Sequence, residues 1–105
     1  MDIKELFQKA FNITLPISGG MGNSIENAVI IHSDGMLNDY TQTEHEVIDY
    51  MAAGRDIQWK LIQQDLIIHE NKKIDRFTIQ VKGIRNNSIP LHDEFMYFDI
   101  TEVAF

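Results

Sequence analysis

The chain has 105 residues, and its content of 44% hydrophobic and 24% charged residues is that of an ordinary globular domain. Its 16 acidic residues against 9 lysines and arginines give a net charge of -7, which opposes the phosphate charge of a nucleic acid or an anionic membrane. The lack of cysteine excludes disulfides and thiolate chemistry. We therefore expect a single α+β domain over residues 1–105 that binds neither nucleic acid nor membrane.

No apolar run approaches the roughly 20 residues that span a bilayer, and the N-terminal segment mixes acidic with apolar residues as an amphipathic helix does. A cytoplasmic location is the resulting expectation. No sequence motif calls for a cofactor, so none is predicted.

Two helices are predicted from apolar stripes with helical spacing. Asp2 with Glu5 and Thr41 with Glu44 have the spacing of capping boxes, and Gly54 stands where the second helix is expected to end. Each helix needs a sheet to pack against, because a helix of about a dozen residues is marginal alone. The two stripes consist of Ile3, Leu6, Phe7, Ala10 and Phe11, and of Val47, Ile48, Met51 and Ala52.

A glycine-rich loop at residues 18–24 leads into a short apolar run at residues 28–31. The run is continuous, which is typical of a strand covered on both faces. The loop carries no lysine and enters a strand rather than a helix, so it lacks the charge and the helix dipole of a phosphate-binding loop. A structural turn or a flap is the favoured interpretation.

The C-terminal half predicts three long strands in a sheet with one apolar and one polar face. Phe77, Ile79 and Val81 alternate with polar residues, which places all three on the apolar face. In the preceding strand the apolar positions change from odd to even near Leu61. A bulge or a strong twist produces such a change and bends the sheet, so we expect a curved sheet.

The register of the hairpin around residues 70–73 is predicted by placing apolar residues of its two strands opposite one another. With a loop at residues 70–73, Leu66 lies beside Phe77 and Ile62 beside Val81, so that apolar residues meet on one face. These side chains are then expected to form the centre of the core.

The last strand is predicted from residue 95 to residue 103. Met96, Phe98 and Ile100 are expected to face the helices, while the alternate positions join the polar face. The reverse assignment stays open, because Phe95 and Tyr97 are also large and apolar enough for a core.

The polar sheet face is the main candidate site, as a ligand pocket or a partner surface. In a pocket, burial and like-charge repulsion would raise the pKa of one carboxyl group. A solvent-exposed face or a dimer interface is the alternative, since aromatic and polar mixtures also occur at protein interfaces. The face consists of Trp59, Gln63, Asp65, Thr78, Gln80, Tyr97, Asp99 and Thr101.

Two pairs of residues are weak candidates for metal binding. His32 and Asp34 share a strand face if the strand continues, and His45 and Asp49 share a helix face. Structural metal sites need three or four convergent ligands, and only pairs are evident, so no metal is predicted. No nucleophile elbow is present, and no catalytic residue is predicted.

The predicted order α-β-α-β-β-β is similar to that of the cystatin-like group, which includes the nuclear-transport-factor-like proteins. The resemblance is one of element order, and it implies two helices on one face of a curved, mainly antiparallel sheet of about four strands. Negative charge without a catalytic constellation indicates a small bacterial-type interaction protein, such as an immunity or adaptor protein. The alternative is a small-molecule-binding protein or enzyme that uses Asp65, Tyr97 and Asp99.

Overall fold

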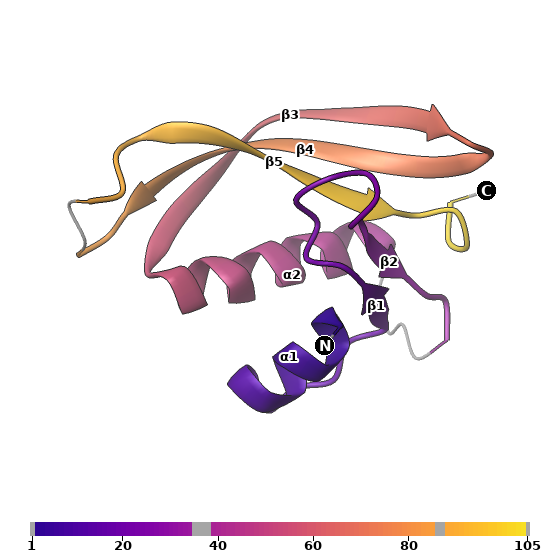
Figure 1. The fold of residues 1–105 in the computed structure, drawn as a ribbon, viewed down its shortest axis with the longest axis horizontal. Helices are drawn as coiled ribbons and strands as arrows, with labels where there is room; N and C mark the ends of the chain where they lie inside the picture. The colour runs from indigo at the N-terminus through magenta and orange to yellow at the C-terminus, as the bar shows by residue number, and fades with distance from the viewer. Residues whose placement is uncertain (1, 35–38, 86–87, 105) are drawn as a thin grey trace.

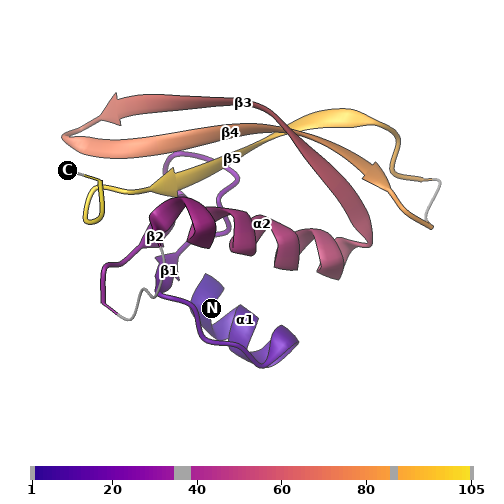
Figure 2. The same cartoon turned by 180° about the vertical axis from the view of Figure 1, so that it is seen from behind.

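The computed structural model describes residues 2–34, 39–85 and 88–104. These residues form two helices and a five-stranded mixed sheet of the α+β class, with both helices on the same side of the sheet (Figures 1 and 2). The strand order is β1-β2-β5-β4-β3; β2 runs parallel to β5, and the other neighbours are antiparallel. The elements are α1 (Ile3–Phe11), β1 (Ile17–Gly19), β2 (Val29–Ile31), α2 (Tyr40–Arg55), β3 (Ile57–His69), β4 (Lys72–Gly83) and β5 (His92–Asp99).

The sheet has one more strand than expected, and it is mixed. The extra strand is β1, which turns back through the glycine-rich loop to pair with β2, so that Ile17 lies opposite Ile31. Two of its three residues are Ser18 and Gly19, which carry no strand signal in the sequence. The α+β class is confirmed, whereas the four-stranded, mainly antiparallel arrangement is not.

Both helices start at an aspartate whose side chain accepts a hydrogen bond from the first turn. Asp2 accepts from the N–H of Glu5 at 3.1 Å, and Asp39 accepts from the N–H of Gln42 at 2.9 Å. The cap of α2 is therefore Asp39 rather than the predicted Thr41. This helix also continues through Gly54 to Arg55, and its C-cap, Asp56, has a left-handed φ of 57°.

The core lies between α2 and the helix-facing side of β4 and β5. Phe77 and Val81 on β4 and Phe98 on β5 are fully buried, and Phe7 of α1 is buried as well. Met96 and Phe98 are buried and lie opposite Phe77 and Asp75, which confirms the predicted facing of these two residues, while Ile100 is buried but follows the strand. That strand ends at Asp99 rather than at residue 103, and turn residues follow it.

A bulge in β3 confirms the predicted change of face near Leu61. The register with β4 shifts between Leu61 and Gln63: Leu61 lies opposite Ile79, and Gln63 lies opposite Thr78. Figure 1 shows β3 rising from the end of α2 and bending along its length, and β3 stays paired with β4 from Ile57 to His69. The odd-numbered residues before the bulge and the even-numbered residues after it therefore face the helices.

The predicted register of the β3–β4 hairpin is wrong by two residues. The turn contains only Glu70 and Asn71, both with positive φ (51° and 65°), so His69 pairs with Lys72. Leu66 consequently lies opposite Asp75 instead of Phe77. The faces are unchanged, but Leu66 lies on the edge strand opposite Asp75 and is 59% exposed instead of buried.

The second half of that prediction is also wrong. The residue opposite Val81 is Trp59, and Ile62 lies at the bulge, where the ladder shifts. Ile62 is exposed rather than buried. The core therefore keeps Phe77 and Val81 from the predicted set and loses Leu66 and Ile62.

Candidate interaction surface

The sheet side that faces away from the helices, which we call the outer face, brings together most of the predicted polar residues. Gln63 lies opposite Thr78, and Asp65 lies on the same ladder as Arg76 and Tyr97. Gln80 lies farther along β4, opposite Asp93 of β5. The grouping of these side chains on one surface follows from the alternation of the three strands.

The chemistry of the outer face is dominated by Arg76, which the sequence-based description of the site did not include. Its guanidinium donates to Asp65 at 3.1 Å and lies 5.2 Å from the ring centre of Phe95. Hydrogen bonds from Gln63 and Arg76 lower the pKa of Asp65. A general acid needs a raised pKa, so Asp65 is set up as an ion-pair partner and not as a proton donor.

Asp99 and Thr101 form a structural cap at the end of β5. Asp99 is 8% exposed, and its Oδ1 accepts from the Thr101 N–H at 3.0 Å and from the Thr101 hydroxyl at 2.6 Å. The Thr101 hydroxyl oxygen accepts in turn from the Lys73 N–H at 2.9 Å. These bonds fix the turn that follows the strand.

Trp59 lies on the opposite side of the sheet from the rest of the predicted site. It precedes the bulge, so it faces α2, where its indole N–H donates to Asp49 at 2.8 Å. The His45 ring lies 5.8 Å from the Trp59 ring and 5.6 Å from the Phe77 ring. Trp59 therefore does not line the outer face as predicted, because the bulge reverses the alternation between it and Gln63.

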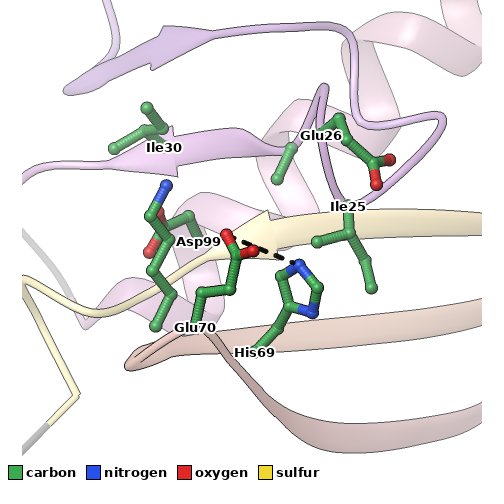
Figure 3. Close-up of a pocket in the computed structure, with 8 residues that line it drawn as sticks. Ile25, Glu26, Ile30, His69, Glu70 and Asp99 are labelled. Atoms are coloured by element: carbon green, nitrogen blue, oxygen red, sulfur yellow. Dashed lines mark ion pairs between the residues drawn. The ribbon is translucent and has the colours of Figure 1, made fainter.

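A small pocket of about 110 Å³ lies where the β3–β4 hairpin approaches β2 (Figure 3). Figure 3 shows the His69 ring turned toward the Glu70 carboxylate, with a separation of 3.9 Å between Nε2 and Oε2. Pockets for drug-sized ligands occupy roughly 300–1,000 Å³, so this one is too small for such a molecule. The other lining residues are Ile25, Glu26, Ala28, Ile30, Lys72 and Asp99.

The two candidate metal pairs have other partners in the structure. His32 contacts the Ser18 hydroxyl at 2.7 Å and the Glu102 carboxylate at 3.4 Å, while Asp34 is exposed. His45 and Asp49 contact Trp59, as described above. Within residues 2–34, 39–85 and 88–104, no group of three or more histidine and acidic side chains is arranged to hold a metal ion.

A buried acidic pair joins α2 to β4. Glu44 is completely buried and Asp75 is 5% exposed, and Asp75 Oδ2 accepts from Gln64 Nε2 at 3.0 Å. Burial, together with the neighbouring Asp75, raises the pKa of Glu44 to about 10. The predicted capping box of Thr41 and Glu44 is wrong, because the helix begins earlier, with Asp39 as its cap.

The C-terminal half of β3 is an exposed edge with apolar side chains, and we call it the β3 edge surface (residues 63–69). It ends the sheet, since among the described strands β3 has β4 as its only neighbour, and none of its residues is buried. Leu66 is 59% exposed and Ile68 is 65% exposed, and their register opposite Asp75 and Lys73 places both on the helix side of the sheet. The β3 edge surface therefore offers a partner both an unpaired strand edge and exposed apolar side chains.

The two edges of the sheet differ in how they are protected. β1 forms the other edge and has only three residues, Ile17–Gly19, which leaves little backbone for another chain to pair with. The N-terminal half of β3 carries Lys60 and the bulge, two features that disfavour edge pairing. Residues 63–69 contain a single charged side chain, Asp65, apart from His69, and no proline or glycine. This segment lacks the usual protection of an edge strand.

Comparison with protein-family models, with curated proteins and with solved structures finds no match for this chain. Of the helices in the described part of the chain, neither combines the length and the apolar character needed to cross a bilayer.

Proposed function

We propose that the chain is a cytoplasmic protein-interaction module, of the adaptor or immunity type, that binds its partner by strand addition along the β3 edge surface. The observation that carries this proposal is the exposure of Leu66 and Ile68 on an unpaired sheet edge. An exposed apolar edge strand presents free N–H and C=O groups that another strand can pair with.

The energetic basis is the combination of backbone pairing and apolar burial. Backbone hydrogen bonds to the edge give affinity, and side chains on either face of the added strand give specificity. Covering a leucine or isoleucine side chain stabilises a complex by about 1.5–3 kcal/mol before the costs of association. Leu66 and Ile68 point to the same side of the sheet, so one partner strand can cover both.

The alternative of a small-molecule binder or enzyme on the outer face has less support. Asp65 is held by Gln63 and Arg76, and Asp99 is used by the turn at Thr101. The two aspartates are separated by β4 and offset along the ladder, because Asp99 lies opposite Ile74. Asp65 and Asp99 therefore do not form the close carboxyl pair that would support acid–base catalysis on the outer face.

Selection of extended peptides from a displayed library tests the proposed function. We expect selected peptides to bind the unmodified chain and to lose affinity about tenfold or more with Leu66→Lys, because the buried leucine is worth about that much. Ile84→Lys is the matched control, since Ile84 is also exposed, at 58%, and the charge change is identical. Peptides that bind all three proteins equally would contradict the proposal.

A further inference from the structure

We propose that the strand added to the β3 edge surface is the same segment of a second copy of this chain, so that the protein forms a symmetric dimer with its dyad axis at Ile67. This inference rests on the proposed function and names its partner. It depends on three features of the surface: which backbone groups are free, which residues oppose one another, and how charge is distributed.

The two-residue turn determines which backbone groups are free. In such a hairpin the residues that flank the turn, here His69 and Lys72, exchange both backbone hydrogen bonds. Because hydrogen-bonded and non-hydrogen-bonded residues alternate along an antiparallel ladder, Ile68, Leu66 and Gln64 direct their N–H and C=O groups to the free edge. Leu66 and Ile68, the two exposed apolar residues of the β3 edge surface, are therefore also residues whose backbone groups can bond to an incoming strand.

The segment is self-complementary when it pairs antiparallel with itself about Ile67. In that register Leu66 lies opposite Ile68 of the second copy, and Ile67 lies opposite Ile67 of the second copy. On the outer face Asp65 then lies opposite His69, a donor that can bond to its carboxylate. Apolar residues meet apolar residues, and the acidic residue meets a histidine.

Neighbouring registers are less favourable. A dyad at Asp65 places two like charges opposite each other, which destabilises a cross-strand pair. A dyad at Leu66 sets Ile68 against Gln64, and a dyad at Ile68 sets Leu66 against Glu70. Of these registers, the dyad at Ile67 is the one in which Leu66 of each copy lies opposite Ile68 of the other.

The charge distribution permits self-association at this surface. The whole chain carries a net charge of -7, so two copies repel each other at long range. The hairpin segment, however, balances Asp65 and Glu70 against Lys72 and Lys73. Salt screens the long-range repulsion over about 10 Å at 0.1 M, so added salt is expected to strengthen the dimer. A basic partner would show the reverse dependence.

Cysteine cross-linking tests the dyad directly, because the natural chain has no cysteine. Ile67→Cys places two thiols across a non-hydrogen-bonded antiparallel pair, whose Cα separation of about 4.5 Å suits a disulfide. We expect Ile67→Cys to form a covalent dimer under mild oxidation, with a yield at least severalfold above that of the exposed control Ile84→Cys. Asp65→Cys and His69→Cys should cross-link with each other when mixed, more than either does alone.

Sedimentation of the unmodified chain at low and high salt provides the second measurement. We expect the dimer dissociation constant to fall with added salt, and to rise about tenfold or more with Leu66→Lys or Ile68→Lys but not with Ile84→Lys. Circular dichroism of each variant checks that it is folded. A chain that stays monomeric and shows no selective Ile67→Cys cross-link overturns the dimer. Peptide binding that remains sensitive to Leu66→Lys in that case leaves the proposed function standing, while its loss overturns both.

Discussion

Glu44 on α2 and Asp75 on β4 place two carboxyl groups side by side in the protein interior. Glu44 is fully buried, and its pKa is raised to about 10 by burial and by the proximity of Asp75. The pair can remain in the core at neutral pH because Glu44 is neutral there.

This pair predicts a stability that falls with rising pH. The pKa of Glu44 is higher in the folded chain than in the unfolded chain, where it is near 4.5, so its stabilising contribution is complete below that value. It is lost as the pH rises toward about 10, with a slope of at most about 1.4 kcal/mol per pH unit. Glu44→Gln keeps a neutral side chain and should remove this slope. Urea unfolding at pH 6 and pH 9 measures it, and an equal slope in both proteins would refute the assignment.

Arg55 and Glu94 predict a dependence of the opposite sign in acid. Arg55 donates to both carboxylate oxygens of Glu94, at 2.7 and 2.8 Å, and these bonds and His92 lower the pKa of Glu94 to about 2. The stabilising contribution is present above the unfolded value near 4.5 and is lost as the pH falls toward 2. We expect Glu94→Gln to lower the free energy of unfolding by about 1 kcal/mol at pH 7 and by little at pH 2. The effect at pH 7 is modest because the ion pair is partly exposed to solvent. The free energy of unfolding of the unmodified chain and of Glu94→Gln, measured between pH 7 and pH 2, provides the comparison.

Gly22 predicts a structural role for the glycine-rich loop. Its φ is 84°, its carbonyl accepts from the Tyr97 N–H at 2.8 Å, and an added Cβ would lie 2.9 Å from the end of the Met96 side chain. Gly22→Ala should therefore lower the free energy of unfolding by about 1–2 kcal/mol. Met21→Ala, at an exposed neighbour, serves as the control. Equal stability of the two variants in thermal unfolding would argue against a fixed turn.

Sequence reasoning predicted the fold where local patterns report tertiary packing. The change of face at Leu61 was visible as a switch in hydrophobic periodicity, and the bulge is its cause. The facing of Met96 and Phe98 followed from alternation alone. The short strand β1 had no such signal, because three residues cannot establish a period.

The sequence did not predict the β3 edge surface, because the hairpin loop was expected to be two residues longer than it is. Lys72 and Lys73 resemble loop residues, so the loop was predicted with four residues, and this assigned Leu66 to the core. The shift of two residues preserves every face, so periodicity could not reveal the error. The positive φ values of Glu70 and Asn71 define the shorter turn. Asn71 is the one sequence signal for it, since asparagine tolerates the left-handed region.

Amide hydrogen exchange at Leu66 and Ile68 tests the central claim, that the β3 edge surface binds a partner strand, most directly. In the dilute free chain both amides point to the open edge and should exchange within the fast class, while neighbours bonded to β4, such as Ile67, exchange slowly. We expect both to become protected when the chain is concentrated or a selected peptide is bound. Exchange at Leu66 and Ile68 that stays fast in a demonstrated complex would contradict the account.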